Sequence, residues 1–241
     1  TTKDRKTLLH MVSYYDHERG VVPRPTIVHD KQGVNDPHDN PSIAIDEQGH
    51  IWVFVSGRGR VRPGFKYRSV KPYDIDAFEL VATDEFTYPQ PWWIEGKGFL
   101  LLFTKYTKGR ELYFSRSADG RTWSPAEKLA GMGGHYQVSN QRKGRVITAF
   151  NWHPKGNVDQ RTNLYFAQTE DLGQTWQTVD GKPLELPLAD THCPALVRDF
   201  QAEGRMVYVK DIQFDEQGNP VVLVVTSASY EPGPKGDPRI W

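Results

Sequence analysis

The sequence predicts an all-β protein of the β-propeller class, with four-stranded blades. Helical periodicity is almost absent, short apolar stretches recur between turn residues, and two different turn motifs repeat at about one blade's spacing. Each stretch is about five residues long and rich in β-branched or aromatic residues, which is typical of β-strands. The clearest stretches are Ile51–Val55 (IWVFV), Phe99–Phe103 (FLLLF), Arg145–Phe150 (RVITAF) and Val221–Val225 (VVLVV).

A glycine turn joins successive strands. Ile45–Phe54 reads IDEQGHIWVF and Phe214–Leu223 reads FDEQGNPVVL, with looser copies at 94–103 and 140–150. Glycine supplies the positive φ that tight hairpins need. The turn glycines are Gly49, Gly98, Gly144 and Gly218. The first two intervals match the roughly 40–50 residues of a propeller blade, and the longer third interval predicts an inserted loop at Thr191–Gly204.

The expected elements can be placed in order along the chain. Leu8–Tyr15 (LLHMVSYY) predicts a strand of a preceding blade, and inner strands are expected to start near Pro37, Tyr88, Tyr136 and Tyr208. This gives four or more blades in one propeller domain over residues 1–241. The Pro/Gly-rich end (EPGPKGDPRIW) stands where a blade should continue. Either the propeller is small, with about five blades, or the domain is incomplete at its C-terminus, as a fragment of a propeller of about seven blades; the abrupt end favours the fragment.

A second repeat contains tryptophan. Ser117–Trp123 reads SADGRTW, and Thr169–Trp176 reads TEDLGQTW. Such an aspartate can accept backbone N–H groups in a hairpin turn, and the tryptophan can pack between strands. We therefore expect Asp119, Asp171, Trp123 and Trp176 to be structural. The pattern resembles the Asp-box of BNR repeats, which belong to the sialidase-like β-propeller superfamily.

Composition excludes several classes of function. Lys+Arg and Asp+Glu both total 30, so the totals imply no basic surface for nucleic acid. The sequence contains no apolar run of 18 residues, so it predicts no transmembrane helix. Cys193 is the only cysteine, which excludes an internal disulfide and thiolate zinc clusters. The sequence contains no phosphate-cradling loop, so we expect no organic cofactor. A structural Ca²⁺ is compatible with the sequence, although no calcium-binding loop is recognisable.

The candidate site is the mouth of the central funnel, where residues at the starts of inner strands and the ends of second strands should converge. Polar groups with aromatic walls at such a place suit a sugar ligand. The candidate catalytic residues are His38, Tyr88, Lys105 and His135. The candidate substrate-binding residues are Asn40, Arg58, Gln90, Tyr136, Asn151, His153, Lys210 and Asp211. Each has an ordinary alternative as a turn residue, a buried polar group or a solvated charge.

The resemblance extends beyond the Asp-box. The segments HDNPSIAIDEQGHIWVFVSGRGR, KYRSVKPYDIDAF, FTYPQPWW and LLFTKYTKG resemble BNR-4 repeat proteins, which include ulvan lyases and other bacterial polysaccharide-degrading proteins. The resemblance implies a histidine that begins one inner strand, a second histidine at the end of the next strand, a Tyr-Pro element and a nearby arginine. His38 and Tyr88 match the first and third. Lys105 occupies the position of the arginine, and Arg58 or Arg60 stands near that of the second histidine.

The expected activity is β-elimination in an acidic polysaccharide. This reaction needs a cation to neutralise the uronate carboxylate, a base for the α-proton and an acid for the leaving oxygen. His38 or His135 could be the base and Tyr88 the base or acid, with Lys105 and Arg58 clamping the carboxylate. A sialidase-like glycoside hydrolase is an alternative, but a glycosidase would need two carboxylates at the mouth. A non-catalytic glycan-binding propeller is the second alternative.

A structural criterion separates these hypotheses. A charged cleft that contains His38, Tyr88 and Lys105 together favours an enzyme, whereas a mouth filled by side chains or by the 191–204 loop favours binding elsewhere. The expected partner is a polysaccharide or glycan. We expect a monomeric protein that is secreted or periplasmic in a bacterium.

Overall fold

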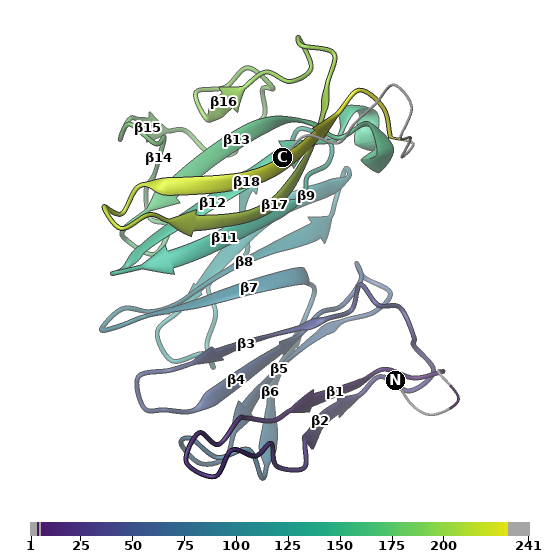
Figure 1. Cartoon of the computed structure of the whole chain (residues 1–241), viewed down its shortest axis with the longest axis vertical. Helices are drawn as coiled ribbons and strands as arrows, with labels where there is room; N and C mark the ends of the chain where they lie inside the picture. Colours follow the sequence, from purple (N-terminus) through teal and green to yellow (C-terminus); the bar gives the residue numbers. More distant parts are fainter. Residues whose placement is uncertain (1–3, 5, 231–241) are drawn as a thin grey trace.

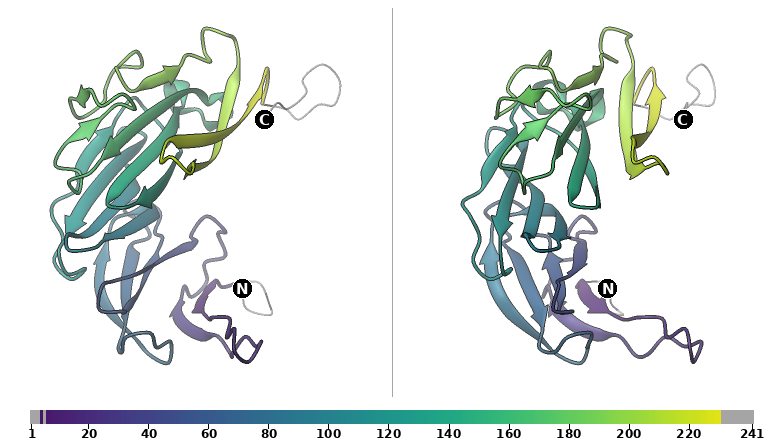
Figure 2. Two further views of the ribbon diagram at one scale, coloured as in Figure 1. Left: turned by 60° about the vertical axis from the view of Figure 1, so that its left-hand side comes forward. Right: turned by 90° about the vertical axis from the view of Figure 1, so that its left-hand side faces the viewer.

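The computed structural model describes residue 4 and residues 6–230, and it is built from antiparallel sheets that follow one another along an arc (Figures 1 and 2). These described residues contain no α-helix, only the short 3₁₀ turns Pro154–Gly156 and Val158–Gln160. The first and last sheets lie at the two ends of the arc (Figure 2). The fold is the predicted β-propeller type.

Two four-stranded sheets form the first part of the arc. Both are antiparallel meanders in which each strand pairs with the next along the chain, the arrangement of a propeller blade. The first contains β3 (Pro41–Ile45), β4 (Ile51–Val55), β5 (Gly64–Ser69) and β6 (Phe78–Asp84). The second contains β7 (Thr87–Ile94), β8 (Gly98–Tyr106), β9 (Arg110–Ser117) and β10 (Glu127–Ala130).

The third sheet is larger than expected. It runs through β11 (Gln137–Arg142), β12 (Arg145–Trp152), β13 (Thr162–Thr169), β14 (Trp176–Gln177) and β15 (Pro183–Leu184). The predicted inserted loop at 191–204 contains a further strand, β16 (Leu196–Arg198), which also pairs with β13. The reason is that β14 pairs with β13 only at Gln168, so β16 supplies partners farther along the same edge.

Two-stranded hairpins stand at the ends of the arc. The first joins β1 (Leu9–Val12) to β2 (Thr26–Asp30), and the last joins β17 (Met206–Phe214) to β18 (Pro220–Ser227). The strand expected at Leu8–Tyr15 is confirmed as β1, although it is shorter, and β2 was not expected. The predicted continuation at the C-terminal end, residues 231–241, lies outside the described residues.

Apolar contacts between neighbouring sheets hold the arc together. Trp52 and Phe54 of β4 pack with Phe99 and Phe103 of β8, while Leu100 and Phe114 of the second sheet join a cluster with the third. All five residues of β4 are buried. Each large side chain removed from water in this way contributes about 1.5–3 kcal/mol, so face-to-face burial of sheets is the main stabilising interaction.

The two tryptophan-containing turns have the structural role expected of an Asp-box. Asp119 Oδ1 accepts the N–H groups of Arg121 (2.8 Å) and Thr122 (2.9 Å), and the Thr122 amide is the main cause of the lowered pKa of Asp119. In the second copy, Asp171 accepts both the N–H and the hydroxyl of Thr175. The carboxylates of both aspartates therefore form their hydrogen bonds within their own turns.

The four inner strands all begin at the same end of the funnel, which is its mouth. β3, β7, β11 and β17 begin close to the predicted positions and contact one another in that order. Side-chain hydrogen bonds link them: Gln90 Nε2 donates to the carbonyl of Gln137 (3.0 Å), and Trp92 Nε1 donates to Ser139 Oγ (2.8 Å). These links bring residues from different sheets to a shared cavity.

Candidate active site at the mouth of the inner strands

A cavity of about 460 Å³ lies where three sheets meet at this mouth. It is lined by His38, Tyr88, Gln90, Thr104, Tyr136, Gln137 and Arg161. None of these residues is an aspartate or glutamate. The cavity therefore combines aromatic rings, neutral polar groups and cationic groups, and it suits a ligand with negative charge.

Tyr88 projects into the cavity from a bulge at the start of β7. The register of β7 against β8 shifts between Thr87 and Gln90, and Tyr88 takes a left-handed φ of 52°. Bulges of this kind redirect a side chain, and positive φ in a non-glycine residue is backbone strain that concentrates at functional sites. The Ser56 hydroxyl accepts the Tyr88 N–H (3.0 Å) and so holds the bulge against the first sheet.

The hydroxyl of Tyr88 is buried and makes no hydrogen bond of good geometry within the described residues. Burial raises the pKa of Tyr88 to about 12, with help from Tyr136 and Tyr106 and against the opposing charges of Arg110 and Arg58. Tyr88 is therefore protonated at neutral pH. A buried O–H without a partner can donate to a ligand oxygen at no loss of an existing bond.

His38 reaches the same cavity from the loop that precedes β3. Its side chain is 55% exposed, and its Nδ1 atom lies 2.6 Å from Oδ1 of Asp36. The other ring nitrogen has no protein partner among the described residues. His38 is thus held from one side and accessible from the other.

Tyr136 forms a platform between two arginines. The guanidinium carbon of Arg110 lies 4.8 Å from the centre of its ring, and that of Arg161 lies 5.2 Å away. The Tyr88 ring meets it edge-on at 6.0 Å. Cations stacked on an aromatic ring are held in place while their N–H groups remain available.

Neither Arg110 nor Arg161 forms an ion pair with a carboxylate in the part of the chain that the structure describes. Arg110 Nε donates to the Tyr106 hydroxyl (3.3 Å), and Arg161 Nε donates to the carbonyl of Val158 (2.7 Å). Both side chains are only partly exposed. Two half-buried cations without counter-charges favour an anionic ligand, because a carboxylate or sulfate ester would compensate them.

Lys105 does not join this site, which corrects the expectation that it clamps a carboxylate beside His38 and Tyr88. It lines a separate cavity with Trp123, and its Nζ pairs with Glu85 at 3.6 Å. The reason is strand alternation: Thr104 faces the mouth, so the next residue along β8 faces the opposite side. The expected group of three is therefore only partly assembled: His38 and Tyr88 share the cavity, and its cation is Arg161 rather than Lys105.

His135 lies at the mouth, but both nitrogens of its ring form hydrogen bonds with backbone groups. It is fully buried; Nδ1 lies 2.8 Å from the carbonyl of Asn151, and Nε2 accepts the Met132 N–H at 3.2 Å. Burial lowers the pKa of His135 to about 4. Because neither ring nitrogen is available to a substrate, His135 cannot be the base. This corrects the expectation that His135 is catalytic.

Several expected binding residues instead support the site. Buried Asn151 accepts the Tyr136 N–H at 2.9 Å and donates to the carbonyl of Val207, so it fixes the platform. His153 is fully buried behind Tyr136, with ring centres 4.9 Å apart, and burial lowers its pKa to about 3. Gln90 lines the cavity, but its amide bonds Gln137 and Ser139.

The remaining expected residues lie at the margin. Asn40, Lys210 and Asp211 are exposed and do not line the cavity. Lys210 lies over the Tyr208 ring at 5.6 Å, whereas Asp211 accepts the Ile212 N–H. Arg58 pairs with Asp36 at 3.6 Å and lies close enough to Tyr88 to act on its pKa.

Sequence reasoning missed Arg110, Arg161 and Thr104. A signal for the arginines was present, since Arg110 begins β9 and Arg161 directly precedes β13. In an antiparallel meander, the third strand starts at the same edge as the first. The expected site comprised only the starts of first strands and the ends of second strands.

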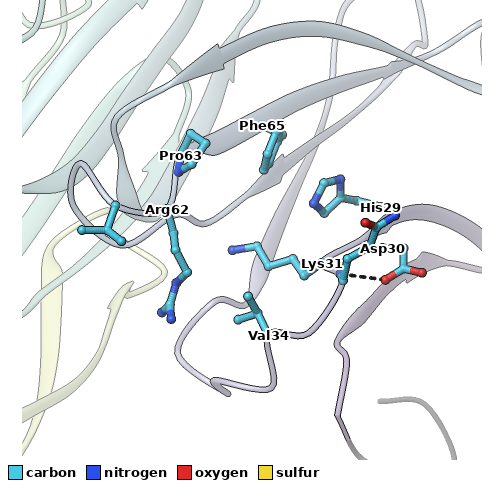
Figure 3. A pocket seen from close by; sticks show the side chains of 9 residues that line it. His29, Asp30, Lys31, Val34, Arg62, Pro63 and Phe65 are labelled. Carbon is cyan, nitrogen blue, oxygen red and sulfur yellow. Dashed lines mark hydrogen bonds between the residues drawn. The ribbon is translucent and has the colours of Figure 1, made fainter.

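A second cavity, of about 260 Å³, lies beside the His38 loop (Figure 3). Lys31, after β2, and Arg62, from the β4–β5 loop, both line it. Lys31 Nζ binds Asp39 Oδ2 at 2.5 Å and the carbonyl of Ser56, while Arg62 binds the other oxygen of Asp39 at 3.1 Å. Burial lowers the pKa of Lys31. Because Asp39 is fully buried, this network anchors the loop between β2 and β3.

Residues 4 and 6–230 contain no cluster of three or more His, Cys, Asp or Glu side chains that could hold a metal ion. Within the same residues, no helix is long and apolar enough to cross a membrane.

The fold and the mouth together define a β-propeller whose funnel carries a cationic, aromatic cavity. The chain belongs to the BNR repeat-containing family, whose model matches residues 10–231. It is similar to ulvan lyases from Alteromonas sp. (strain LOR), 21% identical over 86% of this chain and 50% of the relative, and from Nonlabens ulvanivorans, 23% identical over 85% and 51%. The chain thus spans about half the length of these curated relatives.

Solved structures support the fold. An ulvan lyase of polysaccharide lyase family PL25 superposes with a TM-score of 0.79 at 19% identity, covering 95% of this chain and 62% of that one. A second structure, described as bound to -[GlcA(1-4)Rha3S]-, superposes with the same TM-score at 18% identity and the same coverage.

Proposed function

We propose that this protein cleaves an acidic polysaccharide by β-elimination. The observation that carries the proposal is a cavity with no lining carboxylate among the described residues. In it converge an arginine without an acidic partner there, a tyrosine hydroxyl that makes no hydrogen bond of good geometry there, and an accessible imidazole. Relatives named as ulvan lyases support the same reaction class.

Each step of the elimination has a group suited to it. Arg161, with Arg110 beside it, neutralises the uronate carboxylate and thereby acidifies the α C–H. His38 Nε2 takes that proton, and the electron pair forms a double bond as the β C–O bond breaks. Tyr88 donates its proton to the departing oxygen; the raised pKa that keeps it protonated suits an acid better than a base.

The glycoside hydrolase alternative is less well supported by the geometry. Hydrolysis by the usual route needs two carboxylates that flank the scissile bond, and the described lining contains none. Asp36 and Asp39 are committed to Arg62, and Asp39 is fully buried. The glycan-binding alternative uses the same platform and arginines, and the Tyr88 hydroxyl as a hydrogen-bond donor, but it predicts no change in the bound polymer.

The test is to incubate the full chain with a panel of acidic polysaccharides and follow the ultraviolet absorbance of the unsaturated product. Tyr88→Phe is expected to lower kcat by about 10²–10⁴-fold, the usual contribution of a positioned acid. Little loss of stability is expected, because within the described residues the hydroxyl makes no hydrogen bond of good geometry. Tyr67→Phe is the matched control, since that hydroxyl bonds His29 away from the cavity.

Three outcomes would contradict the proposal. Undiminished cleavage by both Tyr88→Phe and His38→Ala would remove the proposed acid and base. Reducing ends released without the unsaturated chromophore would indicate hydrolysis. Tight binding of polysaccharide without cleavage would indicate a glycan-binding propeller. Because the substrate is a polymer, we propose that the protein acts outside the cytoplasm.

A further inference from the structure

Asp36 holds the imidazole of His38 at two points. Its Oδ1 atom lies 2.6 Å from Nδ1 of the ring and also accepts the His38 backbone N–H at 3.0 Å. We propose that Asp36 is a positioning residue that sets the tautomer and orientation of His38; this inference rests on the proposed function, in which His38 is the base.

The chemistry of the contact determines the tautomer. An ionised carboxylate can only accept hydrogen bonds, so the ring nitrogen beside it carries the proton. In the neutral ring, Nε2 then has the lone pair and is the atom that can remove a proton from substrate. With the opposite tautomer, His38 would present an N–H to the cavity and could not act as a base from that nitrogen.

Asp36 stays ionised because cations surround its second oxygen. Arg62 donates to Oδ2 at 2.7 Å, and Arg58 lies 3.6 Å from the same atom. Burial acts to raise the pKa of Asp36, but the hydrogen bonds from His38 and Arg62 and the charge of Arg58 hold it well below its usual range. The acceptor is therefore present throughout the neutral pH range.

The support of Asp36 extends into the protein interior. Arg62 also binds Asp39 at 3.1 Å, and Asp39 binds the buried Lys31 at 2.5 Å (Lys31 and Arg62 are drawn in Figure 3). The backbone carbonyl of Asp39 bonds the buried His10 at 2.7 Å. A continuous chain of charge-assisted contacts thus runs from the first hairpin to His38, which explains how a half-exposed side chain can be held in one orientation.

The closing experiment compares Asp36→Asn with a matched variant. Asp30→Asn removes an aspartate in the same kind of turn, where Oδ1 accepts the Gln32 N–H at 2.9 Å without a histidine partner. Asp36→Asn is expected to lower kcat about 10–1,000-fold, because the amide can donate to Nδ1 and favour the wrong tautomer, while KM changes less than about threefold. Asp36→Glu is expected to recover part of kcat, and Asp30→Asn to retain all of it.

A measurement independent of turnover accompanies the kinetics. Long-range ¹H–¹⁵N correlation spectra of the wild-type chain are expected to show neutral His38 protonated at Nδ1, and Asp36→Asn is expected to lose this preference. A wild-type chain without lyase activity overturns the proposed function. In an active chain, unchanged kcat in Asp36→Asn, or a wild-type His38 protonated at Nε2, overturns the positioning role alone.

Discussion

Several buried polar atoms that have no hydrogen-bond partner within the described residues lie at or behind the mouth of the inner strands. Natural folds pair nearly all such atoms, so a concentration of exceptions in one place needs an explanation. They include Tyr88 Oη, Arg110 Nη1, Gln137 Oε1 and both ring nitrogens of His153. An anionic, hydroxyl-rich ligand would satisfy several of these atoms at once, which is why we regard the mouth as a binding site.

At the residue scale, Arg161→Gln tests whether this arginine binds the acidic group of the substrate. Loss of the cation is expected to raise KM for an acidic polysaccharide about 10–100-fold, the equivalent of one charged hydrogen bond of about 1.5–3 kcal/mol, and to lower kcat as well, because the α C–H is then less acidic. The free energy of unfolding should hardly change, because Arg161 has no carboxylate partner in the described chain. The measurement is initial rate against polymer concentration, at fixed salt.

Arg198→Gln is the control for Arg161, because Arg198 pairs with Glu203 on the surface, away from the cavity. Its KM should equal that of the wild type. Equal KM values for the wild type and Arg161→Gln would show that the unpaired arginine does not bind substrate.

At the scale of elements, the Asp-box turns are predicted to stabilise the fold without affecting the chemistry. Asp171→Ala removes three hydrogen bonds to Thr175 and is expected to lower the free energy of unfolding by about 1–2 kcal/mol. The kcat and KM of the remaining folded protein should be unchanged. Urea unfolding curves, together with assays normalised to folded protein, measure both quantities.

Glu170→Ala is the matched control in the same turn. Its side chain is exposed, and its one cross-sheet contact, from Lys97 Nζ, is made by the main-chain carbonyl. A stability change in Glu170→Ala as large as that in Asp171→Ala would show that charge in the turn matters, and not the capping of Thr175.

At the scale of the whole molecule, buried neutral histidines predict loss of stability in acid. The pKa of His135 falls from 6.5 to about 4, and that of His153 from 6.5 to about 3, both mainly because of burial. Between pH 6.5 and 4 these two histidines bind protons in the unfolded chain but stay neutral in the folded chain. Each histidine should therefore reduce the free energy of unfolding by about 1.4 kcal/mol per pH unit in that window.

Urea unfolding at several pH values from 7 to about 4 tests this expectation. His153→Phe keeps the ring contact with Tyr136 but cannot be protonated, so its slope against pH should be shallower than that of the wild type. Parallel slopes for the two proteins would mean that His153 does not resist protonation in the folded state.

The sequence by itself determined the strands, their glycine turns and the two Asp-box turns. These features depend on neighbouring residues: alternation of apolar side chains, a positive φ at Gly49 or Gly218, and an aspartate that caps the turn it starts. It also placed His38 and Tyr88 at strand starts, because blade spacing repeats along the chain.

Only the tertiary structure decided which side chains meet. Strand alternation turned Lys105 away from the mouth, backbone contacts used both nitrogens of His135, and the third strands supplied Arg110 and Arg161. Such outcomes depend on strand register and on the stacking of sheets whose residues lie far apart in sequence. A residue's local sequence specifies its strand, but the packing of neighbouring sheets specifies its partners.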